Sequence, residues 1–361
     1  MDFCSCKIVH MKKIIALLIL LSSLMACTDG PGVNVRDVEL SQTERGIYFW
    51  KTKFALNDYE EEFLRIHKVS KLYIKMFDVA LQKDPGNDTL SIVPIATTRF
   101  GSSIPERVDV IPTVYITYDA LLHLSRQNLS YQESYVRRIL TRIDAMSSYN
   151  NLPNMKEVQF DCDWTSTTAY DYYLICDIAK KILNSNGKQF SITLRLHQMD
   201  DDRIPPADRG VLMLYNTGSF KNPKSSNSIL TYNDAQPYIS KHKIPFPVDY
   251  AYPTYSWSLL FRDNEFKCIV RNLDLNDEEL YQKSDYNKFI VQKDTLIAGN
   301  RLLKGDMIRH ETAEFKEIER VKSYLSSRHD IKNSRQIIYH LDSTNLSKYS
   351  DDEIKYIYMA Y

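Results

Sequence analysis

Two aspartates separated by a single residue stand near the end of a predicted strand, in the segment EVQFDCDWT at residues 157–165. Side chains alternate along a strand, so Asp161, Asp163 and Thr165 share one face while apolar side chains occupy the other. Paired carboxylates are the usual means of glycoside hydrolysis. We therefore predict Asp161 and Asp163 as catalytic residues, with Asp163 as the acid because the neighbouring charge of Asp161 would raise its pKa.

Other polar and aromatic residues lie late in, or just after, further predicted strands. Most of them are on the strand face that would line a barrel lumen, while Tyr252 and Trp257 belong to an aromatic run at the end and exit of the seventh strand. We predict that this set binds substrate: Lys75, Arg195, His197, Tyr215, Asn216, Asp249, Tyr252 and Trp257. A structural interpretation stays open for each kind of residue. Arg195 and Lys75 could simply neutralise the aspartates, His197 could be an ordinary hydrogen-bonded histidine, and the aromatic rings could fill a core.

The elements that would position these residues alternate between short apolar strands and amphipathic helices. Such alternation is typical of an α/β protein with a parallel sheet and right-handed crossovers. We predict a (β/α)8 TIM-type barrel over residues 45–361, whose functional residues lie at the C-terminal ends of the strands. The alternation breaks at about residues 261–310, where short strands predict a small α+β insertion after the seventh barrel strand.

The acidic strand resembles the D-x-x-D-x-D-x-E signature of the family 18 glycoside hydrolases, the chitinases and their relatives. Asp161 and Asp163 match its second and third aspartates, Val158 stands at the first, and Thr165 occupies the position of the catalytic glutamate. Met213-Leu214-Tyr215-Asn216 is similar to the sixth-strand M-x-Y-D of the family. The pattern over roughly residues 45–361 also resembles a group of Bacteroidetes lipoproteins.

This resemblance implies a barrel that handles an extracellular glycan. In the chitinases one carboxylic acid protonates the leaving oxygen, and the acetamido group of the substrate can replace the second carboxylate. Thr165 offers no such acid, so we expect chitinase-type catalysis to be absent. Three interpretations remain: a divergent hydrolase using Asp163, a non-catalytic sugar-binding barrel, and a structural or interaction lipoprotein of the envelope with a filled lumen.

The first residues have the pattern of a bacterial secretion signal. Lys12 and Lys13 precede an apolar stretch, and Leu24-Met25-Ala26-Cys27 resembles a lipobox. We predict residues 1–27 as a lipoprotein signal peptide, lipidation at Cys27, and a polar tether over residues 28–44. The protein would then be lipid-anchored in the cell envelope, most naturally at the outer membrane.

The composition excludes several classes of function. Lys plus Arg and Asp plus Glu both number 46, so nothing favours nucleic acid as a partner. Beyond Cys27 the cysteines are Cys162, Cys176 and Cys268, too far apart for a zinc site or a disulfide framework. The chain carries no P-loop, G-x-G-x-x-G, G-x-S-x-G or H-E-x-x-H motif. We expect neither a cofactor nor a metal.

Overall fold

The computed structural model describes residues 43–361 except 85, 87, 88, 153, 154, 202, 241–243, 272 and 361. The predicted signal peptide, Cys27 and most of the predicted tether therefore lie outside the described residues. Glu44, which was assigned to the tether, contacts the barrel: its carboxylate forms ion pairs with Lys71 at 2.9 Å and with Arg335 at 2.7 Å.

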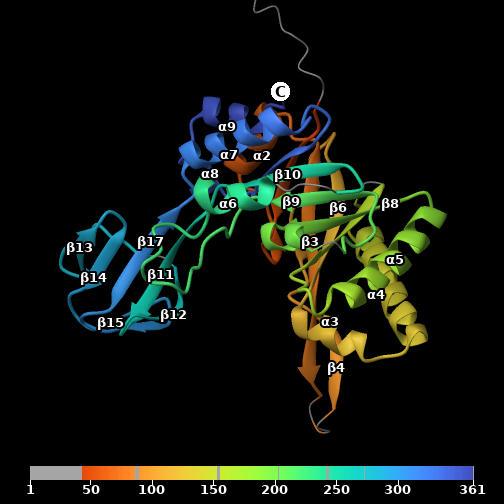
Figure 1. The fold of residues 1–361 in the computed structure, drawn as a ribbon, viewed down its shortest axis with the longest axis horizontal. Coiled ribbons are helices and arrows are strands. Elements are labelled where there is room, and N and C mark those ends of the chain that lie inside the picture. Colours follow the sequence, from red (N-terminus) through yellow and green to blue (C-terminus); the bar gives the residue numbers. More distant parts are fainter. Residues whose placement is uncertain are drawn as a thin grey trace, which may run out of the picture. The chain divides into compact units, whose positions relative to one another are not determined.

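Eight parallel strands close into a barrel, because β1 pairs with β18 on one side and with β3 on the other (Figure 1). Around the barrel the order is β1-β18-β10-β9-β8-β7-β6-β3. The strands are β1 (Arg45–Phe49), β3 (Lys71–Lys83), β6 (Asp109–Ile116), β7 (Glu157–Cys162), β8 (Gln189–Arg195), β9 (Arg209–Met213), β10 (Val248–Pro253) and β18 (Gln336–Tyr339). The prediction of a (β/α)8 TIM-type barrel is confirmed.

In the described residues, a helix or a 3-10 turn lies after each barrel strand except β3, and the helices cover the outside of the barrel. They are α2 (Asp58–Ile66), α3 (Tyr118–Ser125), α4 (Leu129–Tyr149), α5 (Ala169–Ser185), the 3-10 turn η1 (Leu196–Asp200), α6 (Tyr232–Ile239), α7 (Phe315–Arg328), α8 (Ser343–Leu346) and α9 (Asp351–Tyr358). In α4, the buried residues Val136, Ile139, Leu140 and Ile143 recur at helical spacing and form the face that packs inward. No helix in the described part of the chain combines the length and apolar character needed to cross a membrane.

The strands divide their side chains between two cores. The outer faces pack with the helices in one large apolar cluster, which includes Phe160, Cys162 and Trp164 as predicted. The lumen holds a smaller cluster made of Tyr48, Tyr73, Ile111, Val211, Met213, Tyr215, Ala251 and Ile337. In the lumen, the buried Gln159 side chain accepts a hydrogen bond of 2.8 Å from the Tyr48 hydroxyl. This pairing avoids the cost of burying an unsatisfied amide.

Strand β3 continues past the barrel and pairs in antiparallel fashion with β4 (Leu90–Ile95). The short strands β2 (Lys53–Phe54) and β5 (Arg99–Phe100) pair nearby. The extended residues between the second and third barrel strands therefore form a hairpin and a two-residue ladder.

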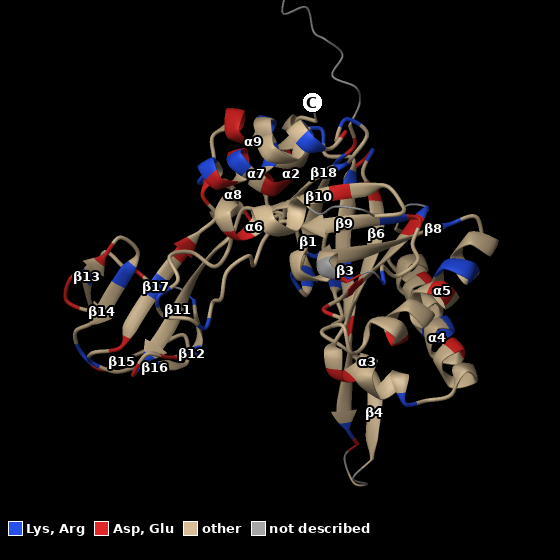
Figure 2. Cartoon of the chain, viewed as in Figure 1, with Lys and Arg blue, Asp and Glu red and all other residues tan. Residues whose placement is uncertain are grey.

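An insertion follows β10, the seventh barrel strand. Its five-stranded antiparallel sheet has the order β12-β11-β17-β14-β13, and a separate pair is formed by β15 and β16. The strands are β11 (Ser256–Arg262), β12 (Glu265–Val270), β13 (Tyr281–Asp285), β14 (Lys288–Val291), β15 (Thr295–Ile297), β16 (Asn300–Leu302) and β17 (Met307–Thr312). The described residues of this interval form strands and no helix, so the expected α+β character is wrong and the insertion is all-β. Residues of both charge signs occur along it (Figure 2).

A buried ion pair within the insertion also makes hydrogen bonds to the loop that follows β9. Arg309 and Glu311 of β17 are both fully buried and lie 2.6 Å apart. The Arg309 guanidinium also donates to the carbonyl of Phe220, and the Ser228 hydroxyl donates to Glu311. The last strand of the insertion, β17, therefore lies next to the loop that follows the sixth barrel strand, β9.

Candidate functional site at the C-terminal mouth of the barrel

Arg195 joins the two predicted catalytic aspartates at the C-terminal end of the barrel. Its Nε donates to Asp163 Oδ1 at 2.5 Å, and its Nη2 donates to Asp161 Oδ1 at 3.0 Å. Asp161 is buried on β7 and also accepts a hydrogen bond from Thr193, the neighbour on β8. Alternation along β7 and β8 thus brings Asp161, Asp163 and Arg195 together, as the parity argument predicted.

The pKa shifts of the two aspartates are the reverse of the prediction: the pKa of Asp161 is raised and that of Asp163 is lowered. Burial acts to raise the pKa of Asp163, but the charge and hydrogen bonds of Arg195 and the Tyr115 hydroxyl outweigh it, so the pKa lies below its ordinary value. Burial raises the pKa of Asp161, and Arg195 offsets this only in part. The interpretation of Asp163 as an acid with a raised pKa is wrong, because the charge and hydrogen bond of Arg195, together with the Tyr115 hydroxyl, lower the pKa more than burial raises it.

Lys75 reaches the same mouth but does not pair with either of these aspartates. Its ammonium lies 3.0 Å from Asp78 on the same strand and 5.8 Å from the centre of the Trp50 ring. The register places Asp78 opposite Tyr115, and Tyr115 opposite Asp161. The suggestion that Lys75 neutralises Asp161 and Asp163 is therefore corrected: Lys75 forms an ion pair with Asp78, and Arg195 forms ion pairs with Asp161 and Asp163.

A row of aromatic rings borders the charged cluster. Trp50 lies 6.0 Å from Tyr339, and Tyr339 lies 4.8 Å from Tyr215, measured between ring centres. Tyr255 continues the row, 6.0 Å from Tyr215 and 5.6 Å from Trp257. Tyr215 is buried, whereas the other four are partly exposed. The ends of β1, β9, β10 and β18 thus combine to form an aromatic border that no single segment supplies.

Two hydrogen bonds, made by Asn216 and Trp257, fix this border. Asn216 has a φ of 55° and accepts a 2.7 Å hydrogen bond from the Tyr255 hydroxyl through its side chain. Asparagine tolerates this left-handed conformation better than most residues. The indole nitrogen of Trp257, at the start of β11, donates to Glu311 at 2.7 Å. Both residues therefore orient aromatic groups at the mouth, in addition to their predicted role in binding.

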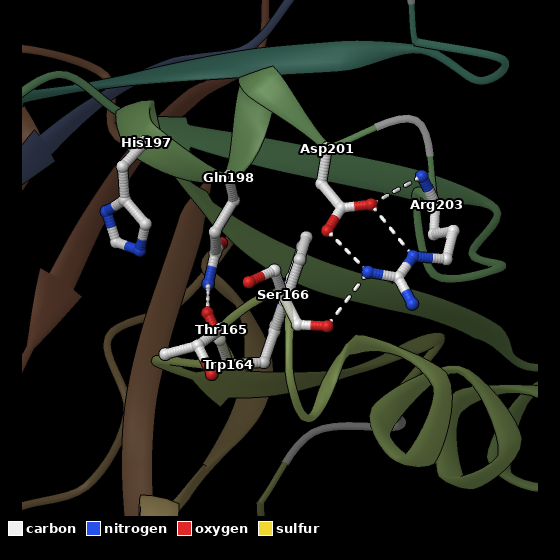
Figure 3. Close-up of a pocket in the computed structure, with 7 residues that line it drawn as sticks. All are labelled: Trp164, Thr165, Ser166, His197, Gln198, Asp201 and Arg203. Carbon is white, nitrogen blue, oxygen red and sulfur yellow. Dashed lines mark hydrogen bonds and ion pairs between the residues drawn. The ribbon is translucent and has the colours of Figure 1, made fainter.

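His197 and Thr165 stand beside the mouth on the rim of a surface pocket of about 650 Å³ (Figure 3). Strand β8 ends at Arg195 and the chain turns into η1, so strand parity no longer applies to His197 and its side chain is exposed. The prediction that His197 enters the lumen is wrong. Gln198 points inward instead and donates to the carbonyl of Trp164 at 2.9 Å.

Thr165 is exposed, and its hydroxyl pairs with that of Thr167 at 2.8 Å. Ion pairing closes the opposite side of the pocket, where Arg203 contacts Asp201 at 3.0 Å and donates to the Ser166 carbonyl (Figure 3). Because Thr165 stands where the family signature has its glutamate, no carboxylate lies at that position.

Asp249 lies at the other end of the barrel, which corrects its assignment to the site. It is the second residue of β10, and it accepts from Arg209 at 2.6 Å and from the backbone N–H of Arg335 at 2.7 Å. Arg335 in turn donates to Glu157, the first residue of β7, at 2.6 Å. Lumen parity was right for Asp249, but parity does not tell at which end of a strand a residue lies.

Tyr252 is also absent from the mouth, because it is on the outer face of β10. Its hydroxyl donates to Gln336 Oε1 at 3.2 Å, and the Lys322 ammonium of α7 lies 4.9 Å from its ring centre. Tyr252 is fully buried in the layer between strands and helices. The neighbouring Ala251 faces the lumen instead.

Sequence reasoning missed several members of the cluster: Asp78, Tyr115, Thr193, Trp50 and Tyr339. Tyr115 could have been found, since it lies on the lumen face of the third barrel strand, opposite Asp161. Trp50 and Tyr339 directly follow or end a strand, where pattern gives little guidance. Among the described residues, no group of three or more His, Cys, Asp or Glu side chains is arranged to hold a metal ion.

Comparison with known proteins gives the fold a context. No protein-family profile and no curated protein sequence matches the chain. The C-terminal domain of a protein named as a candidate chitinase from Desulfitobacterium hafniense aligns over 87% of this chain and 98% of its own, with a TM-score of 0.50 and 11% identity. At this identity the likeness shows a shared chitinase-like barrel fold.

Two further solved structures show similar coverage. The chitinase of Chromobacterium violaceum covers 87% of this chain and 97% of its own, with a TM-score of 0.49 and 9% identity. The spore cortex-lytic enzyme SleL of Bacillus cereus covers 82% of this chain and 70% of its own, with a TM-score of 0.47 and 14% identity.

Proposed function

We propose that this protein binds a neutral glycan at the C-terminal mouth of its barrel and does not cleave it by the chitinase route. The aromatic border formed by Trp50, Tyr215, Tyr255, Trp257 and Tyr339 carries the proposal. A sugar ring has an apolar face of C–H groups and a polar edge of hydroxyls. Partly exposed aromatic rings suit that face, and the adjacent Asp163 carboxylate can accept hydrogen bonds from the hydroxyls.

The charges at the mouth support binding rather than hydrolysis. General acid catalysis requires a proton donor with a pKa near the working pH. The lowered pKa of Asp163 leaves it ionised at neutral pH. Asp161 has a raised pKa, but it is buried beneath Arg195 and Thr193. Thr165 carries only a hydroxyl. The cluster is thus suited to hold a ligand in place, with Arg195 as the support that fixes both carboxylates.

The experiment measures binding of chitotetraose and cellotetraose by calorimetry, in the wild type and in Trp50→Ala. Loss of one stacked ring should weaken binding by about 1 kcal/mol, or roughly fivefold. Tyr149→Ala is the matched control, since Tyr149 is an aromatic residue on α4 with 87% of its surface exposed. Equal affinity of Trp50→Ala and wild type would contradict the assignment of the mouth as the binding surface.

A structural or interaction role with a filled lumen is the second candidate. The observation in its favour is that Arg195 already satisfies both aspartates, as a purely structural ion-pair cluster would. The same titrations separate the two candidates, because a scaffold barrel would bind neither tetrasaccharide.

Lipid anchoring at Cys27 and an envelope location belong to the same proposal and rest on the sequence of residues 11–27. We expect the mature chain to begin at an acylated Cys27 and to partition with membranes. Intact mass measurement of the membrane fraction tests this, and an uncleaved, unmodified N-terminus would contradict it.

A further inference from the structure

A lysine side chain contacts the hydroxyl of the first residue of β11, at the start of the insertion. The ammonium of Lys348, just after α8, donates to the Ser256 hydroxyl at 2.7 Å and to Asn345 Oδ1 at 3.3 Å. No ion pair joins Lys348 to an Asp or Glu within the described part of the chain, because the neighbouring Asp342 pairs with Lys51 at 3.2 Å. The arrangement therefore resembles a nucleophile held against a base rather than an ion pair.

The Lys348 ammonium loses its proton more readily than that of an ordinary lysine. Its partial burial lowers the pKa, and the charge of Asp342 offsets this only in part. A neutral lysine amine can accept the proton of a serine hydroxyl, which is how serine–lysine pairs make serine a nucleophile. Asn345 Oδ1 accepts from the Ser256 hydroxyl at 3.2 Å, and the amide nitrogen of Asn345 donates to Asp342 at 3.2 Å. Asn345 therefore holds the hydroxyl beside the amine.

A second serine and a second base lie on the same face of β11. Ser258 is two residues after Ser256, and the strand register places it opposite His310 of β17. The Ser258 hydroxyl and His310 Nδ1 lie 2.9 Å apart. Burial and the charge of Lys348 lower the pKa of His310, so its imidazole is neutral at neutral pH. Two hydroxyls and two groups that can accept a proton are thus gathered on this face.

Exposure distinguishes Ser256 as the serine that a substrate can reach. Ser258 is buried, whereas Ser256 is partly exposed and Lys348 is exposed. In the sequence, Ser256 stands between Tyr255 and Trp257 of the aromatic border. Because side chains alternate along β11, Ser256 points away from these rings and toward α8, where Asn345 lies. The pair is therefore separate from the surface proposed to bind a glycan.

We propose that Ser256 and Lys348 form an esterase site, which hydrolyses small acyl esters through an acyl-serine intermediate. Ser256 Oγ attacks the carbonyl carbon and forms a new C–O bond, while its proton passes to Lys348 Nζ. The bond to the leaving alcohol then breaks, and Nζ returns the proton to the alcohol oxygen. Water next attacks the acyl-serine, with Nζ taking a proton from the water and returning it to Oγ, and the carboxylic acid is released.

An ester is favoured over an amide because the pair is open to solvent and an alcohol leaves more readily than an amine. The absence of a G-x-S-x-G motif does not bear on this site, since that motif belongs to α/β-hydrolases with a histidine base. A serine–lysine pair is recognised by geometry instead. The proposal does not depend on glycan binding at the mouth.

Labelling of the full chain with a biotin-linked fluorophosphonate tests the proposal. An activated serine displaces fluoride from this probe and keeps a stable phosphonyl adduct. We expect one adduct, which peptide mass spectrometry should map to Ser256, and hydrolysis of p-nitrophenyl acetate that stops once the adduct has formed. The absence of an adduct in the wild type, or an adduct only at another residue such as Ser258, would overturn the proposal.

Substitutions then identify the role of each group. Ser256→Ala should abolish labelling, and Lys348→Met should slow it by about 100-fold or more, the usual effect of losing a general base. Ser347→Ala and Lys355→Met are the matched controls, because Ser347 is an exposed serine beside Lys348 and Lys355 is an exposed lysine paired with Asp352 on α9. Labelling of Lys348→Met at the wild-type rate would contradict the assignment of the base. Because the adduct is mapped in the wild type, the proposal remains testable if a variant fails to fold.

Discussion

Arg335→Met is expected to lower the free energy of unfolding by about 3–5 kcal/mol at neutral pH, the usual effect of removing one partner from a buried ionic network. Arg335 lies at the N-terminal end of the barrel and contacts Glu157 at 2.6 Å, Glu44 at 2.7 Å and Asp249 through its backbone. Glu157 and Asp249 are both buried. Methionine fills a similar volume, so the loss would come from uncompensated charge rather than from a cavity. Chemical denaturation measures it.

The pH dependence distinguishes a charge effect from a packing effect. Burial raises the pKa of Asp249 to about 6, despite Arg209 and Arg335, against roughly 3.9 for an unfolded aspartate. Because the folded-state pKa is the higher one, the cost of the charge is fully present above about pH 6 and declines as the pH falls from there towards roughly 3.9. The destabilisation by Arg335→Met should therefore shrink as the pH is lowered from about 7 to 5.

Arg137→Met serves as the control, since Arg137 forms an exposed pair with Glu133 on α4, and such pairs contribute at most about 1 kcal/mol. A loss of stability in Arg335→Met that is equally large at both pH values would indicate packing and contradict the electrostatic account.

Arg195→Met is the second large effect, and it acts at the mouth. Without the guanidinium, the buried Asp161 and the neighbouring Asp163 would repel each other, and we expect a loss of about 3 kcal/mol in stability at neutral pH. The pKa of Asp161, already raised by burial, should rise further. The double variant Arg195→Met/Asp161→Asn should recover part of the loss, because an amide in place of the buried carboxylate carries no charge.

Arg203→Met provides the comparison on the same side of the molecule. Arg203 forms an exposed ion pair with Asp201, and we expect its loss to change stability by less than about 1 kcal/mol. If Arg195→Met were as stable as Arg203→Met, the ion pairs of Arg195 could not be what holds the two aspartates in place.

The barrel and the centre of the site could be predicted from the sequence because they depend on local periodicity. Alternation along residues 157–163 and 189–195 places Asp161, Asp163 and Arg195 in the lumen, and closure of the barrel makes them neighbours. Parity requires only that the strand be regular. For this reason alternation succeeded for Asp161 and Arg195 inside their strands and failed for His197, which follows the end of β8.

Other features depend on information that no single segment holds. The level of Asp249 along the barrel axis depends on where β10 begins. Only the pairing of β10 with β9 and β18 determines where that strand begins. Tyr252 lies three residues after Asp249 on β10, so the alternation that places Asp249 in the lumen places Tyr252 on the outer face. The pKa order of Asp161 and Asp163 depends on the position of a guanidinium contributed by another strand. Sequence spacing of the two carboxylates cannot supply that position.

The wild-type protein incubated with chitotetraose gives the most direct test of the central claim, when binding and product formation are followed in the same sample. We predict saturable binding in calorimetry, slowed hydrogen exchange in the peptides that contain Trp50 and Tyr255, and no N-acetylglucosamine or shorter oligosaccharides by chromatography. Cellotetraose serves as the second neutral ligand. Steady release of shorter chito-oligosaccharides by the wild type would contradict the account, and so would the absence of any binding at the mouth by both tetrasaccharides.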